Sequence, residues 1–403
     1  PRVTVQLPIF NEQYVAPRLV DSVCLLDYPN DMLEVQVLDD STDETTEIMT
    51  AKVEEWRRKG KNIVFLHRNN RDGFKAGALN EGLKCSAGEF IFVLDADFIP
   101  PVDMLKKMMP YFIDTKIGMV QARWGHLNSD YSLLTKIQSI FLNAHFIIEH
   151  TARYTSGRFF NFNGTAGIWR RQAIVEGGGW QHDTLTEDID LSYRAQMKGW
   201  KFVFLPDVVC PAELPVEMNA FKVQQHRWGK GGVQTGKKLF FRILKSSLPL
   251  KVKLEAYVHL FNNVAYIGTV IMVLLIMPYL VVRSNITFSH LGILEVILFF
   301  FTTVPFLVFY TYAQKETVGK YSFSHIKYLF PLTAIGIGMS ANNSLAAIEA
   351  LIGKKSGFTR TAKYGVANRK DDWKNKKYRM SKISRSTWLE IVLIVYLTMM
   401  LVW

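Results

Sequence analysis

The sequence predicts an α/β domain built on a mostly parallel sheet, followed by a helical region that crosses a membrane. Three observations support this prediction. Over residues 1–250, short apolar strand-like runs alternate with amphipathic helical runs, as they do in α/β folds. Beyond residue 250 the composition shifts to long apolar stretches that carry few charges. Two of these stretches are long enough to span a hydrocarbon core of about 30 Å.

The strands and helices of the first region alternate in a regular order. A strand at residues 3–7 precedes a helix that carries Val15, Leu19 and Val23 on one face. The strand and helix pairs that follow are predicted at residues 34–38 and 42–59, 63–66 and 75–86, and 90–94 and 103–113. Because these strands are apolar on both faces, we expect helices to cover both sides of a parallel sheet.

Acidic and amide side chains stand at the ends of three of these strands, which is where such sheets bind ligands. They are Asn11-Glu12 after the first strand, Asp39-Asp40 after the second and Asp95-Ala96-Asp97 after the fourth. Carboxylates two residues apart can hold a hard divalent ion such as Mg²⁺ or Mn²⁺, which also binds phosphate oxygens. An isolated pair of surface Asp residues is usually only solvated, and Asp39-Asp40 also suits a turn or a helix cap. The shared position at three strand ends favours a ligand site.

Lys75 and Asp188 lie near predicted helix starts. Lys75 comes just before a glycine at such a start, where a cation suits a phosphate or a base, although a solvated lysine is the commoner interpretation. Thr186-Glu187-Asp188 resembles a helix N-terminus with Thr186 as its cap, and that role alone can explain an isolated motif. In the functional interpretation, Asp188 is the general base that deprotonates an incoming hydroxyl group.

Gln224, Arg227 and Trp228 share one face of a predicted helix, because they are three and four residues apart. Arg227 can face a diphosphate, and Trp228 can stack on a sugar ring. A basic interfacial helix with an anchoring Trp explains the same pattern about equally well. We expect the glycines within residues 229–232 to loosen the chain beside this face.

The chain is predicted to divide near residue 250 into a first domain with interfacial helices, residues 1–250, and a transmembrane region, residues 251–403. Spans are predicted at about residues 260–282, 291–312 and 387–403. Residues 328–352 are also apolar, but they contain Asn342 and Glu349, which are costly in lipid. We therefore expect an interfacial or re-entrant segment there. Because the chain begins with Pro rather than Met, we also expect that apolar segments are missing from one or both ends.

The net charge of +12 is concentrated in one segment. Residues 354–385 hold twelve Lys or Arg against two Asp, a net charge of +10. No nucleic-acid-binding fold accompanies this segment, so we expect no nucleic-acid partner. A basic segment between apolar runs is typical of the cytoplasmic face of a membrane. The sequence therefore predicts a multi-pass integral membrane protein in contact with lipid, with its first domain in the cytoplasm and residues 283–290 outside.

Four linked motifs resemble those of the family 2 glycosyltransferases, specifically their cellulose synthase-like membrane branch. They are Asp39-Asp40, Asp95-Ala96-Asp97, Thr186-Glu187-Asp188 and Gln224-Gln225-His226-Arg227-Trp228, in the order of that family. Residues 75–80, 162–167 and 224–228 look most like the mannan and xyloglucan backbone synthases of plants and related bacterial enzymes. The resemblance covers nearly the whole chain and implies a GT-A fold, a Rossmann-like arrangement with a mostly parallel sheet.

The resemblance implies a role for each matching residue. Asp188 would be the catalytic base, supported by Glu187. Binding of the nucleotide sugar is implied for Pro8, Asn11, Glu12, Asp39, Asp40, Lys75, Asp95, Gln224 and Arg227. Asp95 and Asp97 would bind Mg²⁺ or Mn²⁺. Contact with the acceptor is implied for Asn163, Gly164, Thr165 and Trp228, where Asn163 replaces the Cys of a Phe-Cys-Gly sequence in cellulose synthases.

A later segment resembles the F-x-V-T-P-K gating loop of those synthases. Residues 358–363 read Phe-Thr-Arg-Thr-Ala-Lys, so Arg360 replaces the Val and Ala362 the Pro. The resemblance implies a loop at about residues 354–366 that closes over the loaded site. In the closed state three of its residues would contact the nucleotide: Phe358, Thr361 and Lys363.

The residues and the resemblance together predict a processive, inverting glycosyltransferase that extends a β-linked glycan, most simply β-1,4, from UDP-glucose or GDP-mannose. The predicted partners are the nucleotide sugar, the growing glycan acceptor and membrane lipid, and accessory subunits are compatible with the prediction. The main alternative is an enzyme that adds a single sugar to a lipid, because ceramide glucosyltransferases carry a related motif set. A non-enzymatic membrane subunit is disfavoured because every motif keeps its acids, and a transporter because few spans are present.

Overall fold

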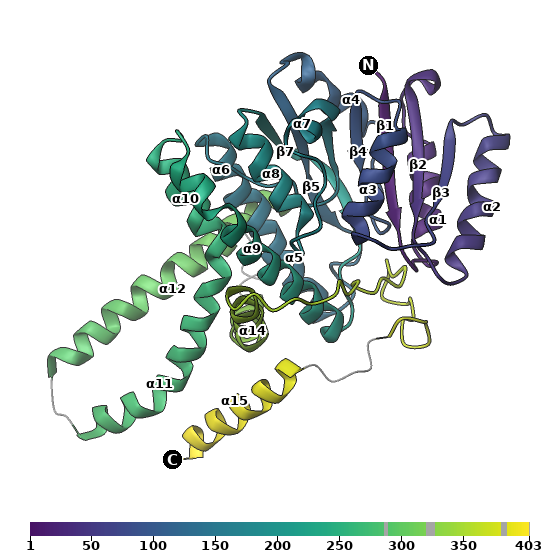
Figure 1. Ribbon diagram of the computed structural model, residues 1–403. Coiled ribbons are helices and arrows are strands. Elements are labelled where there is room, and N and C mark those ends of the chain that lie inside the picture. The colour runs from purple at the N-terminus through teal and green to yellow at the C-terminus, as the bar shows by residue number, and fades with distance from the viewer. Residues whose placement is uncertain (286–288, 320–326, 380–384, 403) are drawn as a thin grey trace.

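One sheet with mostly parallel strands forms the centre of the first region (Figure 1). The computed structural model describes residues 1–285, 289–319, 327–379 and 385–402. Within these residues the strands lie in the order β3-β2-β1-β4-β6-β5-β7. Their bounds are β1 Val3–Ile9, β2 Leu33–Asp39, β3 Ile63–His67, β4 Phe90–Val93, β5 Ile117–His126, β6 Gly167–Arg170 and β7 Lys201–Ala212.

The strand directions confirm the predicted mostly parallel sheet. β1 pairs in parallel with β2 and β4, β2 with β3, and β5 with β7, whereas β6 runs antiparallel between β4 and β5. In the centre, Val5 lies opposite Val35 on one side and Phe92 on the other, and all three side chains are buried. Because parallel strands end at the same edge, the residues that follow β1, β2 and β4 meet there.

Helices cover both faces of the sheet, as predicted. One face carries α1 (Ala16–Cys24), α2 (Thr45–Arg58) and α4 (Met104–Met108), and the other carries α3 (Phe74–Cys85), α7 (Arg171–Glu176) and α8 (Glu187–Met197). The first layer buries Leu19, Met49 and Leu105 against the strands, and the second buries Leu79 and Ile174. Each such side chain contributes about 1.5–3 kcal/mol on burial, so the two layers hold the strand ends in fixed positions.

Two predicted helices differ from the observed ones in their bounds. The helix predicted at residues 42–59 begins at Thr45, whose N–H donates to Asp43 Oδ1 at 2.9 Å in the preceding turn. The helix predicted at residues 103–113 divides into α4 and a 3₁₀ helix around Pro110. Proline has no N–H to donate to the preceding turn, so a continuous α-helix is interrupted there.

A further group of helices lies between the sheet and the apolar C-terminal helices (Figure 1). It contains α5 (Leu133–Ala144), the π-helical turn η3 (His145–His150), α6 (Thr151–Thr155), α9 (Met218–Lys245) and α10 (Leu250–Phe261). Short 3₁₀ helices in the described residues include η1 (Asn30–Met32), η2 (Met109–Ile113) and η4 (Asn262–Val264). α9 is continuous through residues 229–232, so the prediction that these glycines loosen the chain is wrong. A Cβ at Gly231 would lie 2.4 Å from Thr186 Cγ2, so this glycine allows α9 to pack closely against the start of α8.

An apolar helical hairpin extends away from the sheet (Figure 1). It consists of α11 (Ala265–Asn285) and α12 (Ser289–Val318). Within the described residues, two helical stretches are long and apolar enough to cross a membrane, Leu250–Asn285 and Gly292–Val318. They coincide with the first two predicted spans. The predicted outer loop, residues 283–290, includes residues outside the described part of the chain.

Three further helices follow the hairpin: α13 (Leu329–Gly338), α14 (Ser340–Leu351) and α15 (Arg385–Val402). α15 covers the third predicted span except for residue 403, which lies outside the described residues. The segment predicted to be interfacial or re-entrant, residues 328–352, contains the two helices α13 and α14, and α14 packs against α9 and α11. Its polar side chains bind α9, because Asn342 Nδ2 donates to the Lys222 carbonyl at 3.0 Å and Lys230 Nζ lies 2.9 Å from Glu349 Oε2.

Candidate active site

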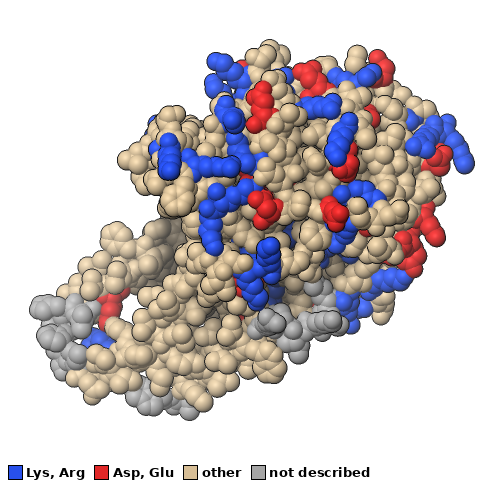
Figure 2. All heavy atoms as spheres, viewed as in Figure 1, with Lys and Arg blue, Asp and Glu red and all other residues tan. Residues whose placement is uncertain are grey.

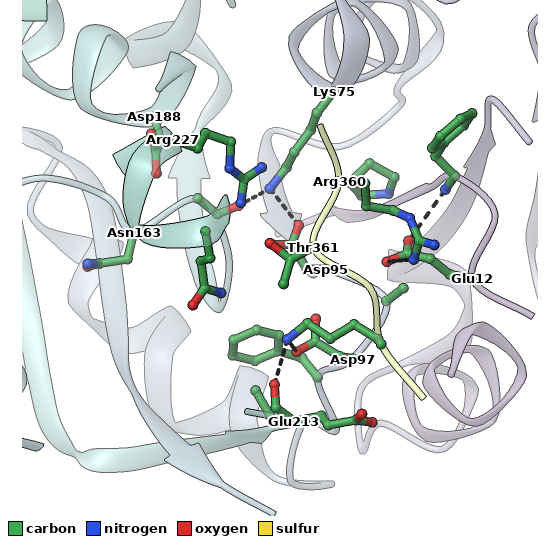
Figure 3. Close-up of a pocket in the computed structure, with 18 of the residues that line it drawn as sticks. Glu12, Lys75, Asp95, Asp97, Asn163, Asp188, Glu213, Arg227, Arg360 and Thr361 are labelled. Carbon is green, nitrogen blue, oxygen red and sulfur yellow. Dashed lines mark hydrogen bonds and ion pairs between the residues drawn. The ribbon is translucent and has the colours of Figure 1, made fainter. Parts of the chain in front are cut away.

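A cavity of about 160 Å³ lies at the carboxyl edge of the sheet, where residues from all the predicted motifs meet (Figure 3). Sixteen of the predicted site residues line it: Pro8, Glu12, Asp40, Lys75, Asp95, Asp97, Asn163, Gly164, Glu187, Asp188, Gln224, Arg227, Trp228, Phe358, Thr361 and Lys363. The other three, Asn11, Asp39 and Thr165, lie behind this lining and support it.

Asp39 and Asn11 do not line the cavity. Their side chains stabilise the turn after β2. Asp39 is fully buried, and its Oδ2 accepts a hydrogen bond from Thr46 Oγ1 at 2.8 Å and lies 2.8 Å from His67 Nδ1. Asn11 has a positive φ of 53°, and its Oδ1 accepts a hydrogen bond from the Thr42 N–H at 2.8 Å. The ends of β1 and β2 are therefore fixed to one another by side chains.

Asp40 does face the cavity, and it is held by an arginine. Arg68 donates from Nε to Asp40 Oδ1 at 2.7 Å and from Nη2 to Oδ2 at 2.6 Å. Such a bidentate pair fixes the plane of the carboxylate. Asp40 is thus positioned at the cavity edge as a rigid hydrogen-bond acceptor.

Lys75, at the first turn of α3, joins three separate segments of the site. Its Nζ lies 2.5 Å from Asp95 Oδ1, donates to the Gly164 carbonyl at 2.8 Å and lies 3.9 Å from Glu187 Oε1 (Figure 3). Burial alone would lower the pKa of Lys75, but the surrounding carboxylates, led by Asp95, raise it above its usual value. Lys75 is therefore a permanent cation between residues Asp95-Ala96-Asp97, called the DxD segment below, and the start of α8.

Gly164 is required by geometry. Its φ is +81°, and a Cβ at this position would lie 2.9 Å from Asp188 Oδ2. Thr165, beside it, is fully buried, and its Oγ1 accepts a hydrogen bond from the Asp95 N–H at 2.9 Å. This loop before β6 thereby brings the DxD segment and Asp188 to the same place.

Asp95 and Asp97 follow β4 and both face the cavity. Asp97 Oδ2 lies 2.6 Å from Lys363 Nζ, which also donates to the Glu213 carbonyl at 2.5 Å. Each carboxylate of the DxD segment is thus paired with a lysine of the chain. Among the residues that the structure describes, no group of three or more His, Cys, Asp or Glu side chains is arranged to hold a metal ion.

Asp188 lies in the first turn of α8, which begins at Glu187. Burial and the adjacent Glu187 raise its pKa to about 7, although Lys75 and Arg227 act in the opposite direction. A carboxylate with this pKa can accept a proton near neutral pH. Thr186 occupies the N-cap position as predicted, but its side chain makes no capping hydrogen bond. Instead it packs against α9.

α9 contributes Gln224, Arg227 and Trp228 from one face, as the spacing predicts. The Arg227 guanidinium carbon lies 4.6 Å from the centre of the Phe358 ring, and its buried Nε has no hydrogen-bond partner. The Trp228 ring lies 6.2 Å from that of Trp124 on β5. The face thus presents one cation with unused donors and one aromatic plane to the cavity.

The segment that resembles a gating loop lies across the cavity (Figure 3). Phe358 stacks on Phe74 with ring centres 5.5 Å apart, and Arg360 Nη1 lies 3.5 Å from Glu12 Oε1. Burial raises the pKa of Glu12 to about 7, and Arg360 only partly opposes this effect. Thr361 is buried in the same segment, and its Oγ1 has no hydrogen-bond partner.

Several residues of the site are absent from the sequence predictions. Arg71 lies in the loop before α3, and its guanidinium carbon is 3.3 Å from the centre of the Phe10 ring. Its side chain lines the cavity, and its buried Nε has no hydrogen-bond partner. Glu213 anchors the loop by accepting hydrogen bonds from the N–H groups of Tyr364 at 2.8 Å and Val366 at 3.1 Å. A basic residue close before Lys75 is the one signal that could have pointed to Arg71.

A second cavity, of about 510 Å³, adjoins the first and leads toward α11, α12 and α14. The two cavities share residues on both sides of Asp188, including Asn163, Gln224 and Trp228. The wall of the second cavity is rich in aromatic, histidine and amide side chains, as in Phe141 and Tyr266. Asp188 lines both cavities, whereas Asp95 and Asp97 line the first and not the second.

Comparisons with known proteins agree with this arrangement. Glucomannan 4-beta-mannosyltransferase 1 of Oryza sativa subsp. japonica is 42% identical over 276 residues, covering 67% of this chain and 52% of that protein. Glucomannan 4-beta-mannosyltransferase 9 of Arabidopsis thaliana is 40% identical over 304 residues, covering 72% of this chain and 56% of that protein. The chain spans about half the length of these curated relatives.

The fold has a solved counterpart. The mannosyltransferase PcManGT from Pyrobaculum calidifontis, in complex with GDP-Man and Mn²⁺, superposes with a TM-score of 0.58 at 23% identity and covers 88% of each chain. This likeness supports the predicted GT-A fold. Residues 1–231, more than half of the chain, match the family model described as Glycosyltransferase like family 2. With its strand-end acids and its Asp188 on α8, the chain belongs to the glycosyltransferase-like family 2.

Proposed function

We propose that the protein is a processive, inverting glycosyltransferase that extends a β-1,4-linked glycan from GDP-mannose. One observation carries this proposal: Asp188, with a pKa of about 7, stands where the acid- and cation-lined cavity meets the larger aromatic cavity. The first cavity suits a nucleotide sugar, and the second suits a glycan chain. Mannose is the donor sugar favoured here because the relatives at 40–42% identity are named 4-beta-mannosyltransferases.

In this proposal the donor lies along the carboxyl edge of the sheet. Asp40 and the nearby Arg71 would contact the nucleoside, since both face the cavity beyond β2. Lys75 and Arg227 would contact the diphosphate, because each carries a positive charge toward the same space. The loop residues Phe358, Thr361 and Lys363 would cover the diphosphate, and the buried Oγ1 of Thr361, which has no hydrogen-bond partner, supports this role. The remaining residues of the proposed donor site are Pro8, Asn11, Glu12, Asp39 and Gln224.

A divalent cation fits the DxD segment. Asp95 and Asp97 offer hard carboxylate oxygens, and Mg²⁺ or Mn²⁺ often binds through one or two carboxylates together with substrate phosphates. Each carboxylate is paired with a lysine, and a divalent cation would take the place of a lysine ammonium group beside it. When bound, the ion would neutralise the charge on the departing diphosphate.

The chemical step is a direct displacement. Asp188 takes the proton from the acceptor hydroxyl as its oxygen forms a bond to the anomeric carbon of the donor sugar. The bond from that carbon to the diphosphate oxygen breaks, and the nucleoside diphosphate leaves with the electron pair. Attack from the side opposite to the leaving group inverts the configuration, and the second cavity, which Asp95 and Asp97 do not line, would deliver the acceptor on that side. Trp228 would carry the acceptor sugar on its ring, with Asn163, Gly164 and Thr165 beside it.

The site lies next to an apolar helical region. α11 and α12 contain stretches long and apolar enough to cross a membrane, and the second cavity is lined in part by α12 residues such as Phe309 and Tyr310. We propose a cytoplasmic catalytic domain at residues 1–250 and a multi-pass membrane region at residues 251–403, in contact with lipid. The basic loop at residues 354–385 would face the cytoplasm. The glycan would leave through the second cavity.

The test is to incubate the purified protein with Mn²⁺ and a panel of nucleotide sugars, and to analyse linkage and length of the product. Release of GDP from GDP-mannose with a ladder of β-1,4-linked products supports the proposal. A single glycolipid product would instead establish transfer of one sugar to a lipid. Absence of nucleotide release from every donor would exclude the enzyme activity.

A further inference from the structure

A π-helical turn, η3 (His145–His150), forms part of the wall of the second cavity. Such turns are rare, and they recur at functional sites. This one joins α5 directly to α6, so it interrupts what is otherwise a single helix. Its residues His145 and Glu149 line the same cavity as Asp188 and Trp228.

The surroundings of His145 fix the tautomer of its ring. Nδ1 lies 2.8 Å from Glu149 Oε2, which is 3.7 Å from Arg153 Nη1, and Arg153 Nε donates to Glu255 Oε1 at 2.8 Å. Burial alone would raise the pKa of Glu149, but the hydrogen bond with His145 and the charge of Arg153 hold it below its usual value. Glu149 is therefore a carboxylate that accepts the Nδ1 proton. In a neutral imidazole this leaves the lone pair on Nε2.

Nε2 of His145 faces Asn163, whose hydrogen bonds are incomplete. Asn163 Nδ2 lies 3.5 Å from Nε2, at the limit of a hydrogen bond, and Asn163 Oδ1 is buried without a partner. The main chain of Asn163 is fixed, because its N–H donates to Gln121 Oε1 at 3.1 Å. A buried carbonyl oxygen without a donor is unfavourable by about 1–3 kcal/mol. The 3.5 Å contact between Asn163 Nδ2 and His145 Nε2 is thus weak, and a hydroxyl group that accepts from one nitrogen and donates to the other could replace it.

We propose that His145 binds a hydroxyl group of the acceptor sugar and that Glu149 positions it. The hydroxyl donates to His145 Nε2 and accepts from Asn163 Nδ2. The inference rests on the proposed function, because it takes the sugar to be the one that stacks on Trp228 beside Asp188. A site built to bind a hydroxyl rejects a sugar in which that group points elsewhere. His145 would therefore help to select the sugar at the end of the acceptor.

The test compares His145→Leu with His145→Gln in the full chain. Glutamine can place an amide oxygen near the position of Nε2, whereas leucine cannot accept a hydrogen bond. The assay uses GDP-mannose as donor, with β-1,4-linked mannotetraose or cellotetraose as acceptor, and it also records hydrolysis of GDP-mannose without acceptor. His145→Leu is expected to raise the acceptor KM about fivefold to tenfold, the loss of one hydrogen bond, and to leave the donor KM and the hydrolysis rate unchanged. His145→Gln is expected to restore most of the affinity.

The control is His182→Leu, because His182 is exposed and lies outside the lining of both cavities. If His145→Leu fails to fold, as judged by thermal unfolding, Glu149→Leu tests the same contact and is expected to raise the acceptor KM about threefold or more. An unchanged acceptor KM, or equal losses in hydrolysis and transfer, overturns the proposal. A wild-type protein that releases no GDP overturns the proposed function itself, and this result appears before any variant is compared.

Discussion

Replacement of Lys75 by Met is expected to move the pH dependence of the reaction to higher pH. Burial and Glu187 raise the pKa of Asp188 to about 7, and Lys75 opposes them. A Cβ built on Gly164 would lie 2.9 Å from Asp188 Oδ2 and 3.5 Å from Lys75 Nζ, so these two atoms are at most about 6 Å apart. At that separation, with an effective dielectric constant of about 20, one unit charge contributes about 3 kcal/mol, or about two pKa units. Screening by the solvent in the cavity reduces this, so we expect a shift of about one to two units.

The sign of the shift follows from the role of the base. Asp188 must be deprotonated to act, so kcat/KM rises as pH passes through its pKa in the free enzyme. Without the Lys75 charge that pKa rises, and the rise in kcat/KM moves upward with it. At pH 7 the deprotonated fraction falls from about one half to about one tenth or less. Loss of a donor contact would lower kcat/KM equally at every pH, so the midpoint separates the two effects.

The measurement is the initial rate of nucleotide release between pH 5.5 and about 9.5, at donor concentrations well below KM. Lys75→Arg keeps the charge and is expected to keep the midpoint near the wild-type value. Lys84→Met, on the same helix but exposed and paired with Glu81, is the control for the loss of a lysine. A Lys75→Met midpoint that is unmoved, or that moves to lower pH, refutes the assignment of Asp188 as the titrating base.

Three further outcomes follow from the site. Asp188→Asn is expected to lower transfer by about 10²–10⁴-fold and to leave the GDP affinity in calorimetry within about threefold, whereas unchanged turnover removes Asp188 as the base. Lys363→Gln is expected to tighten Mn²⁺ binding measured without nucleotide, because Lys363 pairs with Asp97, and weaker binding would contradict this. Gly164→Ala is expected to destabilise the fold by about 1–3 kcal/mol in thermal unfolding and to lower activity, because the φ of Gly164 is +81° and a Cβ would meet Asp188. A variant with wild-type stability and a wild-type rate would contradict both expectations.

The parts of the fold that follow local rules could be predicted from the sequence. The first strands are continuous apolar runs, so their positions along the chain and their parallel arrangement could be predicted, and with them the gathering of Asp40 and Asp95 at one edge. β5 and β7 are not among the predicted strands. Gln121 and Arg123 interrupt the apolar pattern of β5, and Pro206 with the next residue interrupts that of β7. Their pairing is set by contacts across the sheet rather than by local periodicity.

Other features depend on contacts between distant parts of the chain. The loop after α14 is anchored by Glu213, which is more than a hundred residues earlier in the sequence, and no local pattern indicates this pairing. The π-helical turn is equally hidden, because no Pro or Gly marks it between α5 and α6. His150 in this turn is fully buried, and its Nε2 lies 3.0 Å from the Asn161 carbonyl. Tertiary packing of the turn overrides the preference of its sequence for a regular helix.

The charges around the cavity constrain how a donor can bind. Lys363 pairs with Asp97 and Arg360 with Glu12, so two cations of one loop neutralise two acids of the donor site. A divalent cation at Asp97 and the Lys363 ammonium group cannot occupy the same carboxylate oxygen without strong repulsion. If a metal binds Asp97 together with the nucleotide sugar, as proposed, we expect it to displace Lys363 from Oδ2, and the diphosphate would then supply the negative charge that this lysine has lost. The same loop residue would hold the empty site neutral and the loaded site closed, which couples movement of the loop to the arrival of the donor.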